Sequence, residues 1–230
     1  KTDTNHLDFF GASYEYAEAD YKTREEIEQL HKDYALGMLW FLGHDKRVPK
    51  HIRKEMLDWG LPKDEFTDTA NFPYQIYVRE ARRMIGTFVM TEKNVRKTER
   101  TLADHSVGLG SYALDCHYVS RIIDKDGKLR NEGTIFAPTI PYPISYYSMT
   151  PKEEECANLL VTVCLSSSHV AYSTIRMEPV YMILGQSAAT AAAIAIDSEL
   201  SVQKISYDIL RYKLLQDGQL LSIPTKKLKL

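Results

Sequence analysis

Apolar residues near the start of the chain recur every three or four positions, the spacing of one helix face. The pattern covers residues 24–43 and consists of Ile27, Leu30, Tyr34, Met38 and Phe41. We expect a long helix there, opened by a capping box of Thr23 and Glu26. A second helix is expected over 51–58, shortly after Pro49, because proline suits the first turn of a helix.

In the middle of the chain the pattern changes to short β-prone segments separated by turn residues. Residues 106–119 predict a strand, a turn and a second strand, with glycines that allow the close approach of something flat. Residues 121–134 predict a hairpin that turns at Asp126 and Gly127.

Proline and β-branched residues shape the next stretch. The run 135–151 holds four prolines, so it predicts an extended loop with a short strand over 144–147 rather than a helix. Tyr146 and Tyr147 in this strand belong either to the core or to a cleft. The unbroken apolar run 158–165 predicts a buried strand of a parallel or mixed sheet.

Small residues dominate the C-terminal part of the chain. Between Gly185 and Ala195, only Gln186 and Ile194 are not Gly, Ala, Ser or Thr, which predicts a helix over 187–196. We expect the chain to enter this helix at Gly185, where uncovered N–H groups favour a negatively charged or carbonyl-rich ligand. Tight core packing is the alternative reason for such a composition.

These elements together predict a mixed α/β (α+β) fold. A last amphipathic helix is expected over 207–216, capped by Ser206 and ended by Gly218. A chain of 230 residues can bury a substantial core. We expect two parts, residues 1–150 and residues 151–230.

The composition argues against several classes of protein. A net charge of −2 argues against binding to nucleic acid. Three cysteines without a C-x-x-C spacing indicate neither a disulfide framework nor a zinc site, and no metal is expected. The small-residue helix is shorter than the ~20 residues that cross a membrane, and no signal peptide opens the sequence. We expect a soluble protein, and the sequence leaves its compartment open.

Two motifs in the middle of the chain carry candidate chemistry. Residues 108–113 satisfy G-x-G-x-x-A, but a polar stretch precedes them and a β-prone stretch follows, so we reject a dinucleotide-binding loop. Asp115 and His117 would face the same way on a strand. They are either an acid–base pair or a hydrogen-bonded structural histidine with its neighbour.

Arginines cluster in residues 74–89, which suit either a strand or a helix. Arg79, Arg82 and Arg83 form either a solvated basic face, paired with Glu80, or a guanidinium fork that recognises an anion.

Residues 166–196 place His169, Arg176 and Glu178 just before the small-residue run. This segment resembles the C-terminal flavin-contacting segment of FAD-dependent oxidoreductases of the glutathione-reductase-like type. The match is specific in the R-M-E-P stretch and in the Gly-Gln pair. In that family a Gly-x-small-small-Gly helix start points at the isoalloxazine ring, and Ala189 stands where the family often has Gly.

The resemblance covers about residues 21–221 and implies FAD as the cofactor and hydride transfer as the reaction. The cofactor contacts that it implies are Glu178, Gly185, Gln186, Ser187 and Ala188. The residues that it implies for orienting the substrate and moving protons are Arg79, His117, His169 and Arg176. A purely structural pairing of Arg176 with Glu178 is the alternative for that arginine.

Members of this family carry an N-terminal Rossmann half that holds the ADP part of FAD, and this sequence lacks its fingerprint. We therefore expect a substrate domain with a mixed sheet and helices, plus the C-terminal part of an FAD-binding domain. Such a fragment would bind FAD weakly or not at all. Its apolar surface would be exposed or covered by a second copy, and its substrate would be a small molecule or a carbohydrate.

A second class of function stays open, because some relatives of this type carry the label xanthan lyase. A tyrosine-rich cleft with histidine and arginine suits β-elimination on a uronate, but no spacing in the sequence selects such residues. A polysaccharide lyase or carbohydrate-binding module is therefore the alternative to the oxidoreductase, and an inert structural module is a third interpretation. A lyase has no need for the helix entry at Gly185.

Overall fold

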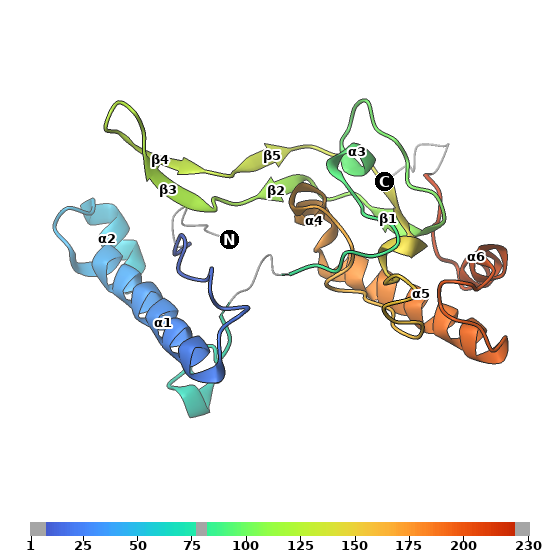
Figure 1. Ribbon diagram of the computed structural model, residues 1–230. Helices are drawn as coiled ribbons and strands as arrows, with labels where there is room; N and C mark the ends of the chain where they lie inside the picture. The colour runs from blue at the N-terminus through green and yellow to red at the C-terminus, as the bar shows by residue number, and fades with distance from the viewer. Residues whose placement is uncertain (1–7, 77–81, 224–230) are drawn as a thin grey trace. The chain divides into compact units, whose positions relative to one another are not determined.

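The computed structural model describes residues 8–76 and 82–223 (Figure 1). The chain divides into two compact units. Unit 1 comprises Lys1–Val78 and Tyr118–Glu132, and unit 2 comprises Arg79–His117 and Gly133–Leu230. The expected division at residue 150 concerns function and stays a prediction.

Unit 1 is built on a helical hairpin. Helix α1 spans Tyr21–His44 and packs against helix α2, Lys50–Leu57, and a short 3-10 turn, η1, spans Thr67–Thr69. Both predicted helices are confirmed, but the predicted capping box is wrong. Asp20 caps α1 instead, because its carboxylate Oδ1 accepts the Thr23 N–H at 2.8 Å.

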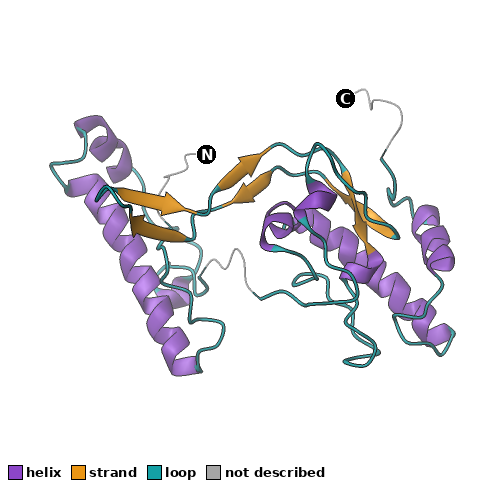
Figure 2. Cartoon of the chain, turned by 45° about the horizontal axis from the view of Figure 1, so that its top comes forward, coloured by secondary structure: helices purple, strands orange, loops and turns teal. Residues whose placement is uncertain are grey.

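The predicted hairpin is confirmed and belongs to unit 1. Strands β3 (Ser120–Ile123) and β4 (Leu129–Glu132) pair antiparallel, as Figure 2 shows. The turn forms because Gly127 adopts a φ of +75°, which glycine tolerates without strain. Asp124 accepts the N–H groups of residues 126 and 128 with its carboxylate and holds the turn closed.

Unit 2 combines helices with two antiparallel strand pairs. Strand β1 (Ser106–Gly110) pairs with β6 (Tyr142–Ser145), and β2 (Leu114–Cys116) pairs with β5 (Ile135–Ala137). The helical elements of this unit are α3 (Glu92–Val95), η2 (Tyr146–Ser148), α4 (His169–Ile175), α5 (Glu178–Asp197) and α6 (Tyr207–Gln216). The described structure is thus a mixture of helices and small antiparallel sheets, which confirms the expected mixed α/β class.

Glycines let α5 and β6 approach strand β1 closely. A Cβ atom at position 108 would overlap the Ile183 side chain of α5, and one at position 110 would lie 2.6 Å from Cζ of the Tyr142 ring. The predicted strand–turn–strand is confirmed, and the rejected dinucleotide loop is absent, because Gly108 and Gly110 lie within a strand. The glycines of this strand serve packing inside the protein.

The predicted buried strand at 158–165 is wrong. Within this run, the structure is irregular and only Leu165 is buried, whereas Leu159 and Val163 are nearly half exposed. Single hydrogen bonds attach the run to its surroundings, such as the Val161 N–H to the Met149 carbonyl at 2.8 Å. An apolar run becomes a strand only where a neighbouring strand offers a ladder of partners, and none of the described strands does so here.

The predicted start of the small-residue helix at Gly185 is also wrong. Helix α5 begins at Glu178, with Pro179 in its first turn, and runs without interruption to Asp197. The apolar residues before Gly185 are good helix formers, and proline pre-forms the first turn, so the helix nucleates seven residues earlier. Gly185 therefore lies in the helix interior, where its N–H belongs to the helical hydrogen-bond ladder.

The length of α5 changes one further expectation. Among the described residues, α5 is a helix long and apolar enough to cross a membrane, a test that the core helix of a soluble protein also passes. Leu184, Ala191 and Ile194 of α5 are buried in unit 2. The prediction that the small-residue helix is too short to span a membrane is therefore wrong for the full length of α5. Its buried face makes α5 a core helix of unit 2.

Helix α6 forms over the predicted residues. Ser206 caps it, and Gly218 follows it with a φ of +78°. Leu210 and Leu214 face the core as predicted, whereas Ile209 and Leu215, which we also expected inside, are 49% and 41% exposed.

We predict that Gly185→Ala raises the free energy of unfolding by about 0.5–1 kcal/mol, because alanine loses less backbone freedom in a helix interior. No atom within 4 Å opposes the new Cβ. Urea denaturation of unit 2 measures the change. Gly110→Ala is the matched comparison and should lower the free energy of unfolding by about 1–3 kcal/mol, because its Cβ meets the Tyr142 ring. A loss of stability in Gly185→Ala would contradict the continuous helix.

Candidate functional site

A buried ion pair joins strand β2 to the end of helix α4. Arg176, the C-cap of α4, is only 9% exposed. Its Nη2 donates to Asp115 at two atoms, carboxylate Oδ2 at 3.2 Å and carbonyl O at 3.2 Å. The Asp115 N–H in turn donates to Ser173 Oγ at 3.1 Å. Residues of α4 and its C-cap therefore bond to both the backbone and the side chain of Asp115. The alternative pairing of Arg176 with Glu178 is wrong, because among the described residues Asp115 is the carboxylate that Arg176 contacts.

His117 lies on the other side of the same aspartate. Its Nε2 is 3.4 Å from Asp115 Oδ1, and its side chain is 37% exposed. The predicted shared facing of the two residues is therefore confirmed. A carboxylate that contacts both an arginine and a histidine can hold the imidazole ring in one orientation. The choice between an acid–base role and a structural role stays a prediction.

Two tyrosines extend this polar region. The hydroxyls of Tyr172, on α4, and Tyr181, on α5, lie 2.7 Å apart. Burial raises the pKa of both phenols, so both are protonated at neutral pH. The nearby guanidinium groups of Arg83 and Arg176 offset part of this rise in the pKa of Tyr172. The Arg176 N–H donates to the Tyr172 carbonyl at 3.0 Å, so Arg176 contacts one tyrosine of the pair directly.

Arg83 connects the tyrosines to the loop before α4. Its Cζ lies 5.2 Å from the centre of the Tyr172 ring, and its Nε donates to the Ser167 carbonyl at 3.0 Å. Of the three candidate arginines, Arg83 is the one that the structure brings to this region. Arg82 is exposed, and Arg79 lies outside the described residues. We call Asp115, Arg176, Tyr172, Tyr181, Arg83, Ser167 and His117 the Arg176 cluster.

Two atoms of the cluster are buried without a hydrogen-bond partner among the described residues. They are Arg176 Nε and Ser167 Oγ, and Ser167 is 7% exposed. An unsatisfied buried polar group costs about 1–3 kcal/mol. Such atoms are typical of places where a ligand or an ordered water completes the hydrogen bonds.

The predicted cofactor contacts lie along α5 and differ in their surroundings. Ser187 is fully buried, and its Oγ lies within hydrogen-bond distance of the Val107 and Ile183 carbonyls. Ala188 is buried in the core. Gly185 and Gln186 lie in the helix interior, so uncovered N–H groups are not found at these four positions. Uncovered N–H groups were the reason to expect cofactor contacts at these four residues, and that reason no longer holds. Their contact with a cofactor stays a prediction.

Glu178 differs from the other predicted contacts because it stands in the first turn of α5. This turn is the positive end of the helix dipole, and it lies one turn before Tyr181 of the cluster. His169, the first residue of α4, is partly buried. Its predicted role in proton transfer stays a prediction.

Other candidates from the sequence have structural roles. Tyr146 is 1% exposed, and its hydroxyl donates to the Val202 carbonyl at 2.6 Å, so it belongs to the core and not to a cleft. Tyr147 packs against that core and meets His105 edge to face. Within the described part of the chain, no group of three or more His, Cys, Asp or Glu residues could hold a metal ion.

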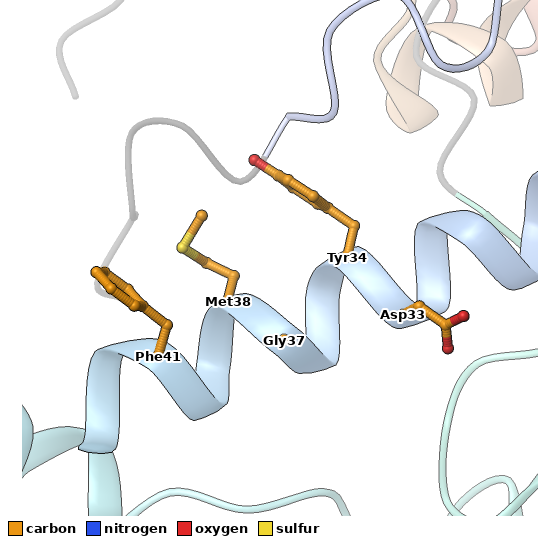
Figure 3. A pocket seen from close by; sticks show the side chains of 5 residues that line it. All are labelled: Asp33, Tyr34, Gly37, Met38 and Phe41. Carbon is orange, nitrogen blue, oxygen red and sulfur yellow. The ribbon is translucent and has the colours of Figure 1, made fainter. Parts of the chain in front are cut away.

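Unit 1 carries a separate apolar hollow on α1. Its volume is about 390 Å³, and Figure 3 shows that Tyr34, Met38 and Phe41 lie along one side of the helix. Gly37 and Asp33 complete the lining. The hollow offers one carboxylate and otherwise apolar or aromatic surface, so it has little capacity for chemistry.

Comparison with known families identifies the class of the chain. The family model described as FAD dependent oxidoreductase matches residues 1–214. The chain belongs to the FAD dependent oxidoreductase family. Comparisons with curated proteins and with solved structures gave no match. In this family member, sequence reasoning proposed Arg176 and His117 as site residues, which stays a prediction. It did not point to the tyrosine pair, because no sequence spacing reveals a hydrogen bond between side chains of two helices.

We predict that Asp115→Asn lowers the free energy of unfolding by about 1–3 kcal/mol, because asparagine leaves the buried Arg176 charge without its counter-ion. Thermal and urea unfolding measure the loss. Asp104→Asn, at an exposed position of unit 2, is the control and should change stability by less than about 0.5 kcal/mol. Equal stability of the two variants would show that the ion pair does not hold β2 to α4.

Proposed function

We propose that this FAD dependent oxidoreductase family member oxidises or reduces a small-molecule or carbohydrate-type substrate beside the flavin, at the Arg176 cluster. The observation that carries the proposal is the buried Arg176 guanidinium, fixed by Asp115 on one side and unsatisfied at Nε on the other. A preorganised, water-poor donor is the kind of group that stabilises developing charge in a reaction.

The residues present fit the flavin part of FAD. The first turn of α5 offers the positive end of a helix dipole. This end favours the carbonyl oxygens of a flat ring and any negative charge on it. The ADP part has no comparable site among the described residues, because the one G-x-G-x-x-A sequence forms a strand. Bound FAD would supply the hydride acceptor or donor at its N5 atom.

Each residue of the cluster then has a role in handling the substrate. Arg176 donates a hydrogen bond to a substrate oxygen, and its own position is fixed by Asp115. His117 accepts the proton that leaves the substrate hydroxyl, and Asp115 Oδ1, 3.4 Å from His117 Nε2, orients the imidazole ring. Asp115 is a positioning residue, because it acts through its two neighbours.

The proposal predicts a yellow protein whose flavin absorbance bleaches when a substrate is added without oxygen. The experiment uses the FAD-loaded protein and a panel of sugars, polyols and small alcohols. His117→Gln should lower the rate of bleaching by about 10²–10⁴-fold while the FAD content stays unchanged, because the general base is lost. His51→Gln, an exposed histidine of α2, is the matched control and should react at the wild-type rate.

Two results would contradict the oxidoreductase proposal. The first is a folded protein that takes up no FAD from solution even when it is joined to the N-terminal half that holds the ADP part of FAD in this family. The second is a loaded protein in which His117→Gln and His51→Gln are reduced equally fast. Unsaturated-uronate absorbance that grows when the colourless protein meets an acidic polysaccharide would favour a lyase instead.

A further inference from the structure

The direction of the hydrogen bonds at the two tyrosines follows from their partners. The Tyr172 hydroxyl donates to the Val163 carbonyl at 3.0 Å. A phenol has one O–H, so Tyr172 can only accept in its 2.7 Å contact with Tyr181. Tyr181 therefore donates to Tyr172.

The hydroxyl oxygen of Tyr181 can still accept a hydrogen bond. Its proton is committed to Tyr172, and no described residue donates a hydrogen bond to it. Tyr181 is only partly buried, so part of its side chain is open to solvent. The cluster thus offers a hydrogen-bond acceptor at Tyr181.

Arg176 offers the complementary group. Its Nε–H is a donor, it is buried, and it has no partner among the described residues. Nη2 is held by Asp115, so the guanidinium cannot swing away to find water. Arg176 and Tyr181 both contact Tyr172, because the Arg176 N–H donates to the Tyr172 carbonyl at 3.0 Å and the Tyr181 hydroxyl lies 2.7 Å from the Tyr172 hydroxyl. The donor and the acceptor therefore belong to neighbouring residues of one cluster.

We propose that Arg176 Nε and the Tyr181 oxygen bind one hydroxyl group of the substrate, which makes the substrate a polyol or sugar rather than a carboxylate. A hydroxyl accepts from the arginine and donates to the tyrosine at the same time. A carboxylate accepts from the arginine but presents only lone pairs to the tyrosine oxygen. This inference rests on the proposed function, because it concerns the same site.

Ser167 offers a place for a second hydroxyl of the substrate. Its buried Oγ has no partner, and Arg83 links its backbone to the Tyr172 ring. A serine hydroxyl both donates and accepts, so it suits another substrate hydroxyl. A substrate with several hydroxyls would use both places, which favours a polyol over a simple alcohol.

Calorimetric titration of the FAD-loaded chain tests the inference with erythritol, xylitol and sorbitol as polyols, and with adipate as a carboxylate that lacks hydroxyls. We expect at least one polyol to bind and adipate not to bind. Tyr181→Phe should weaken the binding of that polyol about tenfold, because it removes the acceptor and little volume. Tyr212→Phe, an exposed tyrosine of α6, should bind as the wild type does.

The ¹H–¹⁵N signal of the Arg176 Nε–H gives a readout that does not depend on turnover. It is assigned by its loss in Arg176→Lys, and it should shift when the polyol is added to the FAD-loaded chain. A shift on addition of FAD alone, with no further change on adding polyol, would overturn the inference and assign the atom to the cofactor. Circular dichroism of Tyr181→Phe shows whether the variant folds.

Three other results would overturn the inference. They are binding of adipate but of no polyol, binding of none of the four probes, and equal polyol affinity of wild type and Tyr181→Phe. All of them are distinguishable from failure of the proposed function, which shows itself as a protein that does not take up FAD or as equal reduction rates of His117→Gln and His51→Gln.

Discussion

The contact between Arg176 and Asp115 is the interaction on which the described site depends. It places a guanidinium that is 9% exposed against a carboxylate of strand β2, and the N–H of the same aspartate donates to Ser173 Oγ. Burying two charges costs free energy that their attraction repays only with good geometry and further hydrogen bonds. The aspartate has these bonds on every side, whereas the arginine has one N–H left over. This asymmetry suggests that the pair is kept for binding rather than for stability.

The small residues of α5 serve this arrangement indirectly. Helix α5 packs against β1 because Gly108 leaves room for Ile183, and because Ser187 and Ala188 add little bulk at the interface. Close packing fixes the rotation of α5 about its axis. That rotation brings Tyr181, in the second turn of the helix, to the hydroxyl of Tyr172 on α4. The composition that resembles a flavin-contacting helix therefore also positions the tyrosine pair.

Local sequence signals predicted the helices and the hairpin, because their causes lie within a few residues. Ser206 and Gly218 bound α6 in this way, and Gly127 sets the turn of the β3–β4 hairpin. Predictions failed where the cause lies far away in the chain. The run 158–165 is apolar but has no neighbouring strand to pair with.

The candidate site shows the same difference between features with local causes and features with distant causes. The spacing of Asp115 and His117 predicts their shared facing, and the resemblance points to Arg176. Neither reveals that Asp115 and Arg176, 61 residues apart, form the ion pair. The start of α5 was misplaced because Gly185 is a strong local signal, and because the helix-forming residues before it outweigh that signal.

The central claim is that the Arg176 cluster lies against the flavin. Hydrogen–deuterium exchange measured by mass spectrometry, with and without FAD, tests it most directly. We expect slower exchange in peptides covering 112–117 and 163–184, which carry the first turn of α5 and every residue of the cluster except Arg83. Bound FAD that leaves exchange in both segments unchanged, and slows it elsewhere, would contradict the account.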